Sequence, residues 1–200
     1  MSAEAAVSMV AALAAGGACA ASILVTRRQA VILALLLQFA GTAVLLSAVP
    51  IALAVAYAAV GLSVAAILAV TPGPQAGIEA ASPSGVPSGL VFRTVSVLLM
   101  SLAAGALGLQ ALGGVQGMLP GQALGSGLLL GLGLLHVGLS EEPLHVGAGL
   151  VAMLGGFEIG YASVEPSVAL HALLIAMPVL IAVVVAYLSL LTPAAPERRP

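Results

Sequence analysis

Apolar residues form long stretches along this chain, separated by short polar breaks or breaks rich in Pro and Gly. A helix needs about 20 apolar residues to cross the roughly 30 Å hydrocarbon core of a bilayer. The breaks predict helices over residues 5–25, 29–48, 50–70, 91–112, 121–139, 144–163 and 167–191. We therefore expect an all-α fold, a polytopic membrane bundle of about seven transmembrane helices.

The breaks also predict how the chain is divided. Arg27 and Arg28 follow the first helix, and Pro50 marks a tight second turn. The segment 71–90, rich in Pro, Gly and Ser, is expected to be a flexible cytoplasmic linker. It separates a three-helix part, 1–70, from a four-helix part, 91–192, which is followed by a tail, 193–200. Because the remaining turns are short, consecutive helices are predicted to be antiparallel neighbours.

The arginines predict an orientation, because positively charged loops stay in the cytoplasm. With seven crossings, one topology places Arg27, Arg28, Arg93 and the Arg198–Arg199 pair on the same side. The N-terminus is then outside and the C-terminus cytoplasmic. The arginine distribution favours a bacterial cytoplasmic (inner) membrane.

Composition excludes several classes of function. The chain is 62 % hydrophobic and 6 % charged, whereas a soluble domain carries about 25 % charged residues. The five arginines are too scattered to bind nucleic acid. Cys19 is the single cysteine, so neither a disulfide nor a thiolate metal site is available within the chain. Nucleotide-binding and hydrolase motifs are missing, so we expect no cofactor and no catalysis by this chain alone.

Glycine spacing predicts close helix packing, since association of helices in lipid depends on small residues. Three pairs are spaced by four residues, on the fifth and sixth predicted helices, which are expected to pack tightly together. A competing interpretation is that glycine is simply common in membrane helices. The pairs are Gly121 and Gly125, Gly127 and Gly131, and Gly156 and Gly160.

Glu158 is the one acid well inside a predicted helix. A buried ionisable residue normally faces a partner or water, and a carboxyl group in low-dielectric surroundings can be tuned to exchange protons. It is interpreted either as part of a proton path or as a hydrogen-bonded structural residue. His171 follows the next turn at about the same number of residues as Glu158 precedes it, so the two residues are expected at a similar depth. Their side chains can meet if the helix rotations allow it.

Other polar residues are weaker candidates for a proton path. Gln38 is near the centre of the second predicted helix, where it can bond to another helix or line a polar path, and Tyr57 on the third helix can lie near it. A further cluster surrounds one turn and is expected to be a solvated connection, with proton uptake or metal binding as alternatives. It consists of His136, Glu141, Glu142 and His145.

The segment Gly156-Phe157-Glu158-Ile159 carries a family resemblance. The chain resembles the E component of hydrogenase-4-type membrane complexes, which is similar to the K subunit of respiratory complex I. In that subunit a Gly-x-Glu-Ile segment carries an intramembrane glutamate of the proton path, so the resemblance implies this role for Glu158. Arg27, Arg28 and Gln38 also resemble the N-terminal part of the E component. The third helix of that family often bears a lysine. This chain lacks Lys throughout and offers Tyr57 on its third predicted helix instead.

Together these patterns predict a non-catalytic membrane subunit of a redox-driven proton-translocating complex of the NADH dehydrogenase or hydrogenase type. Its partners are expected to be lipid and other membrane subunits. One alternative is a structural or assembly protein without a transport role. The other is a small-molecule carrier, which is disfavoured because the arrangement of three and four helices shows no inverted repeat.

Overall fold

A computed structural model describes residues 2–47, 51–71, 89–112, 114–164 and 167–191. These ranges contain seven helices and no strand, and each predicted helix agrees with the observed bounds within two residues. The helices are α1 (Ala3–Leu24), α2 (Arg28–Leu46), α3 (Ile51–Val70), α4 (Leu90–Leu112), α5 (Pro120–Leu139), α6 (Pro143–Ala162) and α7 (Val168–Leu191). All seven are long and apolar enough to span a membrane, which indicates an integral membrane protein. Residues 72–88 of the linker predicted over 71–90, and the predicted tail from 193 to 200, lie outside the described residues.

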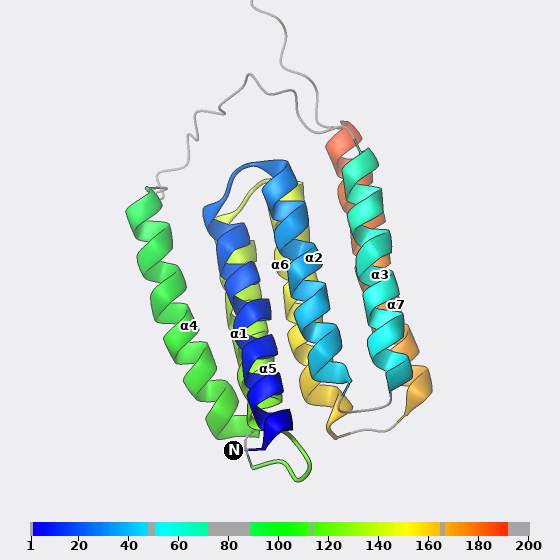
Figure 1. Cartoon of the computed structure of the whole chain (residues 1–200). Helices are drawn as coiled ribbons and strands as arrows, with labels where there is room; N and C mark the ends of the chain where they lie inside the picture. The colour runs from blue at the N-terminus through cyan, green and yellow to red at the C-terminus, as the bar shows by residue number, and fades with distance from the viewer. Residues whose placement is uncertain (1, 48–50, 72–88, 113, 165–166, 192–200) are drawn as a thin grey trace, which may run out of the picture.

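The helices form two layers (Figure 1). In one layer α1, α2 and α3 follow one another, and in the other α5, α6 and α7 follow in the same order. Across the layers α1 packs against α5, α2 against α6, and α3 against α7. The remaining helix, α4, lies at one edge against α5 and, more lightly, against α1. The most buried helices are α1, α5 and α6, while α4 and α7 are mostly exposed.

Proline and side-chain caps determine where several helices begin. Pro120 and Pro143 occupy the start of α5 and α6, where a missing backbone N–H costs nothing. Gln122 caps α5, because its Oε1 accepts from the Leu119 N–H at 2.9 Å. Its Nε2 donates to the carbonyl of Leu45 at 2.9 Å. The start of α5 is thereby tied to the end of α2.

Glycines let α5 approach three other helices closely. A Cβ atom added at Gly121 would collide with the backbone of Ser8 on α1, and one at Gly127 would collide with the backbone of Ala104 on α4. Gly125 likewise faces α1 and α2, and Gly131 faces α4. These four glycines were expected to allow close helix packing, and they lie at close contacts with α1, α2 and α4. Spacing alone says which residues share a face, but not which neighbour that face meets.

The predicted close packing of α5 and α6 is nevertheless observed, and theirs is the largest helix interface of the described residues. A Cβ atom at Gly133 of α5 would lie 2.7 Å from the carbonyl oxygen of Gly149 of α6. One at Gly156 would lie 2.8 Å from the carbonyl oxygen of Ser126, whose hydroxyl donates to the carbonyl of Gly156 at 2.6 Å. Of the predicted α6 pair, Gly156 therefore takes part, and Gly160 is half-buried.

Arg27, Arg28 and Arg93 lie at one end of the bundle, which we call the arginine end (Figure 1). This end holds the last turn of α1 and the first turns of α2 and α4. Arg28 donates to the carbonyl of Leu68, so it also fastens α2 to the end of α3. The N-terminus lies at the opposite end. The three described arginines are thus at the same end of the bundle.

Candidate functional site

Glu158 lies on α6, about 6 Å along the helix axis from its last residue, towards the end opposite the arginines. The residue is 1 % exposed. The flanking Gly155 and Gly156 remove side-chain bulk from the same turn. This leaves the carboxyl group inside the bundle rather than facing lipid.

Two hydroxyl groups from other helices approach the same turn of α6. A Cβ atom added at Gly155 would lie 2.6 Å from Oη of Tyr57 on α3 and 3.7 Å from Oγ1 of Thr42 on α2. The Tyr57 phenol is also close enough to interact electrostatically with the Glu158 carboxyl group and to face the Thr42 hydroxyl. We refer to Thr42, Tyr57 and Glu158 as the carboxyl cluster. It brings together α2, α3 and α6.

The groups of the carboxyl cluster lack hydrogen-bond partners among the described residues. Thr42 Oγ1, Tyr57 Oη and Glu158 Oε1 are all buried and unpaired. Although the Thr42 and Tyr57 hydroxyls face each other, they do not form a hydrogen bond of normal geometry. An unpaired buried polar group costs about 1–3 kcal/mol. Three such groups at one point therefore mark a candidate functional site.

Tyr57 contacts α2 through Phe39. Its ring packs on Phe39, with ring centroids 5.1 Å apart, and Gly61 on α3 leaves space for the Phe39 ring. Gln38 is buried on α2, one turn before Thr42. Thr42 was missed by the sequence argument. Its spacing of four residues from Gln38 was the available signal, because it places both side chains on one helix face.

His171 is buried on α7 but does not pair with Glu158. Within the described part of the chain no hydrogen bond or ion pair joins the two side chains. The imidazole Nδ1 instead donates to the carbonyl of Ser167 at 2.9 Å. The ring lies 5.6 Å from that of Tyr161, measured between centroids. Its Nε2 is buried without a partner.

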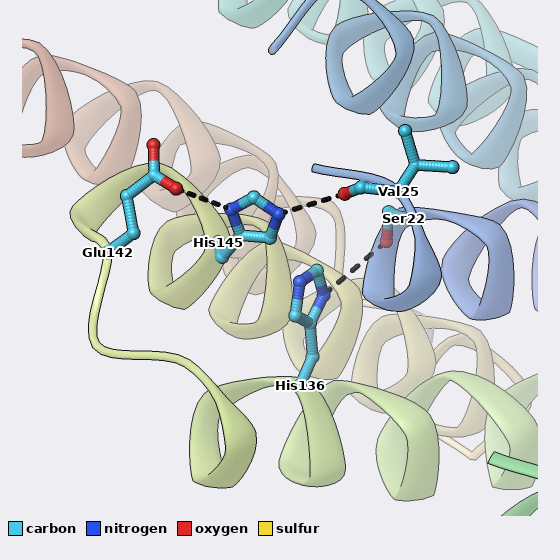
Figure 2. A network of polar contacts seen from close by, with 5 residues as sticks. All are labelled: Ser22, Val25, His136, Glu142 and His145. Atoms are coloured by element: carbon cyan, nitrogen blue, oxygen red, sulfur yellow. Dashed lines mark hydrogen bonds and ion pairs between the residues drawn. The ribbon is translucent and has the colours of Figure 1, made fainter. Parts of the chain in front are cut away.

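A second polar cluster lies at the arginine end, where α1, α5 and α6 meet (Figure 2). The expectation of a solvated connection is wrong for its histidines, because His136 is 0 % and His145 6 % exposed. They are buried because each lies on a helix, α5 or α6, at a position that meets the end of α1. Glu141 and Glu142 remain exposed. Among the described residues no group of three or more His, Cys, Asp or Glu side chains is arranged to hold a metal ion.

The fold and the carboxyl cluster define a polytopic membrane protein with a buried, unpaired carboxyl group between three helices. Such a group can hold and release a proton, but the cluster contains no nucleophile paired with a base. The chain matches no protein-family model, no curated protein and no solved structure.

Proposed function

We propose that this chain is a non-catalytic membrane subunit of a multisubunit, redox-driven proton-translocating complex. In this proposal Glu158 is a proton carrier, and Tyr57 and Thr42 orient the water or proton that it exchanges. The observation that supports the proposal is that Thr42 Oγ1, Tyr57 Oη and Glu158 Oε1 are buried together, each without a hydrogen-bond partner in the part of the chain that the structure describes. A carboxyl group that only locked two helices together would be expected to have a permanent partner.

The resemblance of the Gly156–Ile159 segment to the K-type subunits of NADH dehydrogenase and hydrogenase complexes supports the same role. In the proposed orientation the arginine end faces the cytoplasm of a bacterium. Glu158 then lies in the outer half of the membrane and belongs to the release side of the path. Lipid and neighbouring membrane subunits would cover the exposed apolar faces of α4 and α7.

A structural or assembly role is the second candidate, and the tight α5–α6 interface favours it. Under this alternative Glu158 is a protonated residue that fills space between α6 and α3. The two candidate functions predict different results when the Glu158 carboxyl group is replaced by an amide, which has no ionisable proton. A structural role tolerates an amide at position 158, whereas a proton carrier does not.

The test is proton pumping by native membranes or by a complex purified through a tag on this chain. We expect the complex with Glu158→Gln to assemble normally and to lose most of its proton pumping. Electron transfer either continues at the normal rate or slows together with pumping. Glu141→Gln is the matched control, because Glu141 is an exposed glutamate at the other end of the bundle. If Glu158→Gln assembles and pumps like the control, Glu158 has no transport role and the structural candidate takes its place.

A further inference from the structure

The polar cluster at the arginine end runs inward from the surface (Figure 2). The side chain of Glu142 is 46 % exposed, and its Oε2 lies 3.2 Å from Nδ1 of the buried His145. Nε2 of His145 lies 3.1 Å from the carbonyl of Val25 on α1. The His145 ring meets His136 edge-on, with centroids 5.4 Å apart. Nδ1 of His136 lies 3.4 Å from the hydroxyl of Ser22.

The partners of His145 determine where its protons lie. The carbonyl of Val25 can only accept, so Nε2 of His145 carries a proton. If this imidazole were neutral, the lone pair of Nδ1 would lie 3.2 Å from an oxygen of Glu142, in a contact that does not have the geometry of a hydrogen bond. A carboxylate at that distance would repel the lone pair. The arrangement therefore favours one additional proton, held between Glu142 and His145 either as an imidazolium–carboxylate pair or on the carboxyl group.

The same reasoning fixes the neutral tautomer of His136. The Ser22 hydroxyl donates its proton to the carbonyl of Cys19 at 2.7 Å. Its oxygen can therefore only accept from His136, which places the proton of the neutral ring on Nδ1. Nε2 is then an acceptor, and it is buried without a partner among the described residues. A vacant proton acceptor thus lies beside a pair that holds an extra proton.

The charges around the two rings are few. Arg93 of α4 is the cation that acts on both imidazoles, and Glu142 is the anion that acts on His145. Arg28 of α2 directs its guanidinium to the carbonyl of Leu68 on α3. From α1 the rings meet the uncharged Ser22 and the carbonyl of Val25. The anion attracts a proton from the surface, and Arg93 opposes the accumulation of further positive charge.

We propose that Glu142, His145 and His136 form a proton-uptake relay at the arginine end. A proton arrives at the Glu142–His145 pair from water and passes to Nε2 of His136, whose ring lies 5.4 Å from that of His145 between centroids. The pair is left as a carboxylate and a neutral imidazole, and His136 becomes an imidazolium with a proton on each nitrogen. No electrons move. The relay rests on the proposed function only for the direction in which the proton travels. Its residues are separate from Glu158, because His145 and Glu158 are about 20 Å apart along α6.

The test uses the full chain in liposomes with ¹⁵N-labelled histidine. The chain has only three histidines, so the ring nitrogens can be assigned by comparison with single His→Phe variants. At pH 8 we expect His136 to carry its proton on Nδ1. His145 is expected to carry one on Nε2, with its Nδ1 in proton exchange with Glu142.

Glu142→Gln is the decisive variant and Glu141→Gln its control. Both change one exposed glutamate next to α6, but only Glu142 faces an imidazole. Glu142→Gln is expected to slow hydrogen–deuterium exchange at the His136 and His145 rings about tenfold or more, in line with the loss of a positioned proton donor. His171 signals serve as the check that the fold is unchanged. The control is expected to leave all three rings as they are.

The relay is overturned if the neutral His136 ring carries its proton on Nε2. It is also overturned if Glu142→Gln and Glu141→Gln give the same exchange rates. These readouts need no partner subunit, so they are independent of pumping. If the histidine measurements contradict the relay but Glu158→Gln still loses pumping, the relay is wrong and the proposed function stands.

Discussion

Both polar clusters of this bundle contain buried atoms without a hydrogen-bond partner among the described residues, but only the arginine-end cluster also has hydrogen bonds to backbone carbonyls. At the arginine end, Ser22 and His145 have backbone or side-chain partners. In the carboxyl cluster, one atom each of Thr42, Tyr57 and Glu158 has none. Removal of a group from a paired network leaves its partner unsatisfied, whereas removal of an unpaired group relieves a cost. The clusters should therefore respond oppositely to the same kind of substitution.

The largest effect on stability is expected from Gly155→Ala. The added Cβ would lie 2.6 Å from Oη of Tyr57, so the ring or α6 must shift, at a cost of about 1–3 kcal/mol. Gly17→Ala on α1 is the control, because a Cβ there meets nothing within 4 Å. The free energy of unfolding in mixed micelles measures both.

Tyr57→Phe in the Gly155→Ala background sharpens this test. It removes the colliding oxygen and is expected to restore most of the lost stability, which a double-mutant cycle detects as coupling. If the two changes are simply additive, Tyr57 does not reach Gly155 and the carboxyl cluster is misassigned.

His145→Phe is expected to have the next largest effect. The substitution leaves the Val25 carbonyl without its donor and separates Glu142 from its partner, so we expect a loss of about 1–3 kcal/mol. The same unfolding assay measures it. A loss within error of zero would mean that the arginine-end cluster is solvated, contrary to the burial of both rings.

The smallest effect is expected from Thr42→Val, which removes an unpaired hydroxyl and conserves shape. We expect stability to be unchanged or to increase, by less than about 1 kcal/mol. Ser126→Ala is the contrasting variant, because it removes the bond from Ser126 to the Gly156 carbonyl and is expected to cost about 0.6 kcal/mol. Equal losses in the two variants would show that the Thr42 hydroxyl has a permanent partner.

Most of the fold was predictable from the sequence, because helix ends are local features. Apolar length defined each helix, and Arg27 and Arg28 marked the first turn. Pro120 and Pro143 are the first residues of α5 and α6, one residue before each predicted start. These signals lie in the chain next to the boundary that they mark.

The site was less predictable, because it depends on helix rotation and on which helices meet. Burial of Glu158 followed from hydropathy, but its neighbour is Tyr57 on α3 rather than His171 on α7. Tyr57 reaches α6 because Gly155 has no side chain. Likewise His136 and His145 lie on either side of the connection between α5 and α6, and the sequence did not show that both rings are buried against the end of α1. Such contacts join segments far apart in the chain, and residue spacing within one helix does not encode them.

The central claim is that Glu158 changes its protonation during turnover, and infrared difference spectroscopy of the working complex tests it most directly. We expect a carboxyl C=O stretching band that appears or disappears with turnover and is missing in Glu158→Gln, while Glu141→Gln keeps it. A spectrum without such a band, or one with the band unchanged in Glu158→Gln, would contradict a proton-carrying role for this residue.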